Sequence, residues 1–86
     1  MTEYIYNIHI LLADGSTIPA LQGVRLHSPQ YGQLTEADVL AAIRANPQAY
    51  SYSVDRQMGM VYLGSAAIPL EQFRGIKAEL VSMSIL

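Results

Sequence analysis

Residues 34–45 constrain the fold most, because they are the one stretch of the chain whose pattern predicts a full helix. Thr35 is a favourable N-cap residue, and Asp38 follows it at the spacing of a capping box. The helix is expected to end at Asn46, because a residue before a proline avoids the α region. The apolar side chains of this helix form one narrow stripe, which predicts packing against a flat partner such as a sheet.

Two strands are predicted before this helix. Residues 4–12 alternate between a wholly apolar face and a mixed face, which is typical of a strand. Residues 17–27 include Pro19, which cannot donate a ladder hydrogen bond, and Gly23, which indicates a bulge. The second strand is therefore expected at a sheet edge. Residues 28–32 are rich in turn formers and are expected to link this strand to the helix.

The register of the first two strands depends on the length of the turn between them. A two-residue loop would leave Ile10 opposite a proline. A three-residue loop over residues 13–15, with a left-handed glycine, sets Ile10 opposite Ile18 instead. In the same register, Ile8 lies opposite Ala20. The three-residue loop is preferred because it pairs apolar residues on one face.

Three strands and one helical turn are predicted after the helix. Residues 50–54 alternate tyrosine and valine with serine, and residues 60–63 form a short strand that is apolar on both faces. Residues 69–75 form a single helical turn, since proline suits a first turn and glycine a C-cap. Residues 76–86 form the last strand, which carries apolar residues on both faces beyond Leu80.

This order of elements predicts one small α+β domain over residues 1–86. It is expected to contain a single mixed sheet of four to five strands with one main helix (ββαββ). The order resembles the β-grasp architecture of ubiquitin-like domains, and the resemblance implies that the first and last strands are central and parallel. The last residues lack the double-glycine tail of conjugated modifiers, so no modifier role is implied. The alternative is an all-antiparallel meander with one helix.

Composition narrows the classes of function. Charged residues are 14% of the chain, whereas soluble domains average about 25%, and hydrophobic residues reach 51%. With a net charge of -2 and five lysines and arginines, the chain has too few cations for a nucleic-acid partner. No run of apolar residues is long enough to span a membrane, and the N-terminus is not that of a signal peptide. These features, with the absence of cysteine, favour a cytoplasmic protein.

The residue pattern does not indicate catalysis. His9 and His27 have no third ligand at metal-binding spacing, and the seven acidic residues are scattered rather than paired. The glycines do not match a phosphate-binding loop. We therefore expect no catalytic residues, no metal, no cofactor and no enzymatic activity.

The main functional prediction is a protein–protein interaction module, most simply a homodimer. One helix of about 10 Å diameter covers about two strands on one side of a sheet, which leaves Ile5 and Leu11 bare on the other. The last strand needs a bulge to place Leu80 and Val81 on one face. A second copy or another protein is therefore expected to cover a sheet face or an edge strand. The predicted interface residues are Ile5, Leu11, Val81, Met83 and Ile85.

Two alternatives to this interface remain open. Loops and the helical turn could fold over the bare face and leave a monomer. The chain could also be a small-ligand-binding domain, with a pocket between helix and sheet near Tyr50, Tyr52 and Phe73.

Overall fold

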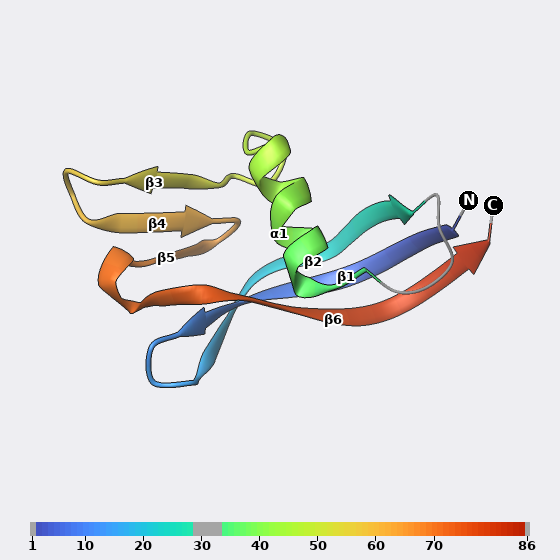
Figure 1. Ribbon diagram of the computed structural model, residues 1–86, viewed down its shortest axis with the longest axis horizontal. Coiled ribbons are helices and arrows are strands. Elements are labelled where there is room, and N and C mark those ends of the chain that lie inside the picture. The colour runs from blue at the N-terminus through green and yellow to red at the C-terminus, as the bar shows by residue number, and fades with distance from the viewer. Residues whose placement is uncertain (1, 29–33, 86) are drawn as a thin grey trace.

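The computed structural model describes residues 2–28 and 34–85, which form two antiparallel sheets, one α-helix and one 3₁₀ turn (Figure 1). The long sheet, sheet A, has the strand order β2-β1-β6, with β1 (Thr2–Leu12), β2 (Thr17–Ser28) and β6 (Phe73–Ile85). The short sheet, sheet B, is a meander of β3 (Ser53–Asp55), β4 (Met60–Leu63) and β5 (Ala66–Pro69). The helices are α1 (Glu36–Ala45) and η1 (Leu70–Gln72). Sheet B lies at one end of the molecule, and α1 stands between it and the far ends of the sheet A strands (Figure 1).

The α+β class is confirmed, but the prediction of a single mixed sheet is wrong. The structure has two separate three-stranded sheets, and all of their strand pairs are antiparallel. The first and last strands are neighbours, as the β-grasp resemblance implies, but β1 and β6 run antiparallel rather than parallel. Strand β5 was not predicted. Because β5 and β3 pair with the two edges of β4, sheet B is complete in itself and does not extend sheet A.

The predicted helix and both of its caps are confirmed, although the helix itself begins only at Glu36. The Thr35 hydroxyl accepts a hydrogen bond from the N–H of Asp38 at 3.1 Å, and the Asp38 carboxylate accepts one from the N–H of Thr35 at 3.0 Å. This is the expected capping box. Val39 and Ile43 are buried, so the apolar stripe faces the core.

The hairpin between β1 and β2 follows the predicted register at its start and departs from it further on. Ile10 lies opposite Ile18, as the three-residue loop requires, and the glycine of the turn is left-handed. Ile8 lies opposite Leu21 rather than Ala20, because the register shifts by one residue on β2. The prediction for Ile8 is therefore wrong.

The predicted edge position of β2 and the bulge at Gly23 are both confirmed. β2 is an outer strand of sheet A, and its register shifts again between the partners of Tyr6 and Ile8. Gly23 has a φ of 67°, and its N–H donates to the side-chain oxygen of Asn7 at 3.1 Å. The side chain of Asn7 thus satisfies a backbone donor that the bulge removes from the ladder.

Several predicted boundaries shift. The strand predicted over residues 50–54 is shorter and begins later, as β3 (Ser53–Asp55). Tyr50 lies instead in the turns that follow α1. The helical turn predicted over 69–75 is confirmed in part as η1, and β6 begins at Phe73, three residues earlier than expected. The link predicted over residues 28–32 lies, after Ser28, outside the described residues.

The core lies between one face of sheet A, α1 and sheet B. Burial of each large apolar side chain stabilises the fold by about 1.5–3 kcal/mol. The largest fully buried side chains come from β1, α1 and β4: Tyr4, Tyr6, Ile8, Ile10, Val39, Ile43, Val61 and Leu63. The Tyr6 hydroxyl accepts a hydrogen bond from the N–H of Leu34 at 3.2 Å. Burial raises the pKa of Tyr6 above its ordinary value, and the Leu34 hydrogen bond opposes that rise.

Candidate functional site

Sheet A has two edges, and the β2 edge is protected. The turn after β4 covers part of it, because the N–H and the hydroxyl of Ser65 donate to the carbonyl oxygen of Ala20 at 3.0 and 3.3 Å. Further along β2, His27 Nε2 lies 3.2 Å from Glu3 Oε2, and Arg25 lies 4.0 Å from the same carboxylate. Cover, charge, proline and bulge are the devices by which natural sheets block unwanted strand pairing.

The opposite edge, β6, is open. In the described part of the chain, β6 pairs only with β1. Within that part, the backbone groups of residues 74–85 form no hydrogen bond outside this pairing. From Leu80 to the end of the sequence there is no charged residue. The second half of β6 is therefore an unpaired edge without charge protection.

A bulge at Val81 turns the apolar side chains of this segment to one face. Tyr6 lies opposite Leu80 and Ile5 lies opposite Ser82, so Val81 is an extra residue in the ladder. In such a bulge two residues oppose one, and both side chains point to the same side of the sheet. Leu80 and Val81 thus share the helix-facing side, which the sequence pattern allowed only if a bulge formed here.

Three exposed apolar side chains follow along this side, and we call them the apolar row: Val81, Met83 and Ile85. They are 54%, 57% and 81% exposed. Met83 lies opposite Tyr4, which is 2% exposed, and Ile85 lies opposite Thr2. The row therefore continues the core-facing side of sheet A to the end of the strand that projects beyond α1 (Figure 1).

The five predicted interface residues do not share one surface. Val81, Met83 and Ile85 are brought together, whereas Ile5 and Leu11 are half-buried on the far side of the sheet. The prediction that the last strand is apolar on both faces is wrong. The bulge shifts the alternation of side chains by one residue, so the serines that follow it point to the far face. On β6 the residues that point to the far face are Lys77, Glu79, Ser82 and Ser84.

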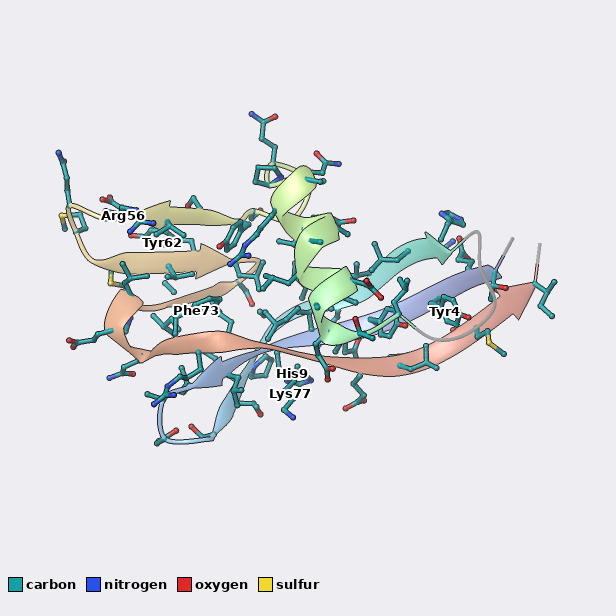
Figure 2. The ribbon with its side chains drawn as sticks, viewed as in Figure 1. Tyr4, His9, Arg56, Tyr62, Phe73 and Lys77 are labelled. Carbon is teal, nitrogen blue, oxygen red and sulfur yellow. The ribbon has the colours of Figure 1, made fainter. Side chains whose placement is uncertain are left out.

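Sequence reasoning missed two charged residues on this far face. Lys77 lies opposite His9 and Glu79 lies opposite Asn7. Figure 2 shows His9 and Lys77 on the side of sheet A that faces away from α1. Both charged side chains are exposed, and neither has an ion-pair partner in the described part of the chain. The signal was present in the sequence, where apolar and charged residues alternate just before the uncharged end.

The residues predicted to line a ligand pocket contribute to the core instead. Tyr50, Tyr52 and Phe73 are half-buried and pack against the buried cluster. The structure contains an open cavity of about 650 Å³ beside sheet B. Its lining consists of Met58, Gly59, Met60, Pro69, Leu70 and Glu71. The predicted tyrosines are absent from that lining.

The described residues offer no metal site. No group of three or more histidine, aspartate or glutamate side chains within residues 2–28 and 34–85 could hold an ion. His9 lies between Pro19 and Lys77 in the sheet, and His27 Nε2 lies 3.2 Å from the carboxylate of Glu3. Over the same residues, none of the helices is both long and apolar enough to cross a lipid bilayer.

The open edge of β6 with its apolar row is the candidate site. Two features define it, the unpaired backbone of β6 and the exposed apolar side chains beside it. No protein-family model matches this chain, and no curated protein or solved structure matches it either.

Proposed function

We propose that this chain is a small non-enzymatic interaction module that binds a protein partner by adding a strand to the open edge of β6. The observation that carries the proposal is the coincidence, in one segment, of an unpaired backbone edge and the apolar row. In strand addition, main-chain hydrogen bonds supply affinity and alternate side chains supply specificity. β6 offers both, because among the described residues its backbone is unpaired on one side along the strand, and the apolar row lies in its second half.

Both contributions enter the energetics of association. Complete burial of a side chain the size of Met83 or Ile85 stabilises a complex by about 1.5–3 kcal/mol. Association costs about 4–15 kcal/mol in lost freedom of motion. The three side chains of the apolar row, which are already partly covered in the single chain, would together supply a stabilisation of the same order as that cost, and backbone pairing along β6 adds to it.

A selection of short peptides tests this proposal without assuming a partner. A library of random twelve-residue peptides is panned against the chain immobilised sparsely enough that no second copy can reach β6, and the enriched peptides are titrated into the isotopically labelled protein at a concentration where it has the mass of one chain. We expect them to protect the amides of β6 from hydrogen exchange and to leave those of β2 unchanged. We also expect their affinity to fall at least tenfold for Met83→Lys, because the new charge has to be buried in the complex.

Two results contradict the proposal. One is that no peptide is enriched, and the other is that enriched peptides protect residues outside β6. Gln57→Lys is the matched control, because it adds the same charge to an exposed turn of sheet B. Its affinity for the peptides should equal that of the wild type.

A further inference from the structure

We infer that the strand added to β6 comes from a second copy of this chain, paired antiparallel about a two-fold axis at Ala78. The inference rests on the proposed function and names its partner. The two copies would form one continuous antiparallel sheet with the order β2-β1-β6-β6-β1-β2. Such a contact is isologous, so each copy presents the same segment to the other.

The regular part of β6 limits where a second strand can pair. The register of β6 against β1 is interrupted at Arg74 and again at Val81, and residues 75–80 pair one to one with β1 between these interruptions. A bulge disrupts the ladder and bends the strand. The regular segment between the two bulges is therefore the part that can accept another strand in an even ladder.

Only axes at Lys77 and Ala78 keep five residues of this segment paired, and the charges select between these registers. In a two-fold antiparallel pair, an axis at Lys77 sets that lysine opposite its own copy, and an axis at Glu79 does the same for the glutamate. Like charges directly opposite each other destabilise a sheet. An axis at Ala78 sets Lys77 opposite Glu79 of the second copy, and this pair occurs twice. It also sets Ile76 opposite Leu80 on the helix-facing side.

The surroundings fit this register. Lys77 and Glu79 are exposed and have no ion-pair partner in the described part of their own chain. Residues at equal distances from the axis meet, so Met83 lies beside Phe73 of the second copy, which is half-buried and apolar. Met83 thus gains an apolar neighbour, whereas Val81 falls opposite Gly75 and Ile85 opposite Glu71 of the second copy.

The two helices would begin at different positions along the paired strands. α1 begins beside Tyr6, because the N–H of Leu34 donates to the Tyr6 hydroxyl, and Tyr6 lies opposite Leu80. The second helix would begin beside Leu80 of the second copy, which faces Ile76, four residues or about 13 Å along the strand. This separation exceeds the roughly 10 Å diameter of a helix.

Charge reversal tests the register directly. Lys77→Glu gives a chain with two glutamates at the contact, and Glu79→Lys gives one with two lysines. Each variant alone should dimerise about thirtyfold more weakly than the wild type, because both cross-strand pairs become repulsive. A one-to-one mixture should dimerise like the wild type, because every glutamate then meets a lysine. Both sites are exposed, so the fold should be unaffected.

Light scattering behind a sizing column, over a concentration series, gives the readout. We expect twice the 9.4 kDa mass of one chain for the wild type and for the mixture, at concentrations where each variant alone has the mass of one chain. Arg56→Glu is the control, because it makes the same charge change as Lys77→Glu at the distant turn of sheet B (Figure 2). This control should dimerise normally.

Cysteine cross-linking provides a second readout, since the chain has no cysteine of its own. Opposite residues in an antiparallel pair have Cα atoms about 4.5–5.5 Å apart, which a disulfide can span. Ala78→Cys should therefore form a covalent dimer on oxidation, and Ser84→Cys, far from the axis, should not.

Distinct results overturn the inference and the proposed function. A wild type with the mass of one chain at every concentration, or a mixture that fails to dimerise, overturns the second-copy inference. Cross-linking through Ser84→Cys rather than Ala78→Cys overturns the register. In each case, selected peptides that still protect β6 amides leave the proposed function standing.

Discussion

The two edge strands of sheet A, β2 and β6, differ in how far they are protected from pairing with another chain. Both are long strands that flank β1, and each has one side without a strand neighbour. The β2 edge carries Pro19, a bulge at Gly23 and the ion pair of Arg25 with Glu3, and the turn at Ser65 covers part of it.

The second half of β6 has a bulge at Val81 but, in the part of the chain that the structure describes, no proline, no charged residue and no covering turn, and it ends in exposed apolar side chains. The charged residues of β6, Arg74, Lys77 and Glu79, all lie in its first half, so only the second half of that edge lacks charge protection.

The largest expected effect comes from removing the cover over the β2 edge. Gly64 has a φ of 56°, and a Cβ there would overlap the carbonyl oxygen of Ala20 and the side chain of Leu21. Gly64→Ala should lower the free energy of unfolding by about 3 kcal/mol or more, through strain and lost packing. Urea denaturation measures this loss.

Gly59→Ala is the matched control for that substitution. Gly59 has a φ of 67°, but an added Cβ meets no atom within 4 Å. Its cost should be only the backbone penalty of about 1 kcal/mol. Equal losses for the two variants would show that the β4–β5 turn does not depend on close contact with β2.

The next largest effect concerns the apolar row. Met83→Lys should weaken association at least tenfold and change the free energy of unfolding by less than about 0.5 kcal/mol, because Met83 is exposed in the single chain. Leu11→Lys, on the half-buried far side of β1, should instead lower stability by about 1–2 kcal/mol. Sedimentation and urea denaturation separate the two outcomes. If Met83→Lys unfolds the chain, Met83 belongs to the core and the interface assignment fails.

A smaller effect is expected from giving β6 the kind of protection that β2 has. Ser84 lies opposite Glu3 on the far face. Ser84→Lys would add a charge to the open edge and a cross-strand ion pair worth about 0.2–1 kcal/mol. We expect slightly higher stability and weaker association, measured by thermal unfolding and light scattering. Stronger association of this variant would contradict the role assigned to missing charge.

The smallest effect lies at the turn where β2 begins. Hydrogen bonds from the side chain and then the backbone of Ser16 lower the pKa of Asp14 below its ordinary value. The stabilisation is therefore present above the ordinary aspartate pKa and is lost as the pH falls through the lowered one. Carbon-detected NMR titration should show the lowered pKa, and Asp14→Asn should remove this part of the acid dependence. An Asp14 carboxyl group that titrates at the ordinary aspartate pKa would contradict this prediction.

The sequence predicted local structure better than long-range pairing. The capping box at Thr35 and the bulge at Gly23 follow from neighbouring residues, so both were predictable. Strand β5 was missed because Ala66–Pro69 is short, follows a glycine turn and ends in proline. Without it, the separation of sheet B from sheet A could not be foreseen.

The candidate site was predicted in part for the same reason. The need for a bulge at Val81 could be read from two adjacent apolar residues, and that bulge explains the apolar row. Ile5 and Leu11 lie on the opposite face of sheet A from the apolar row. This separation depends on the direction and register of β6 against β1, which are set by contacts between distant parts of the chain. The pairing of Lys77 with Glu79 between copies becomes visible only when their common face is known.

Residue-resolved hydrogen exchange as a function of protein concentration tests the contrast between the two edges most directly. If β6 is the edge that accepts a partner strand, amides within residues 75–85 that point away from β1 should become protected as concentration rises, whereas exchange along β2 should stay constant. Exchange in β6 that is independent of concentration, or protection that rises equally in β2, would contradict the account.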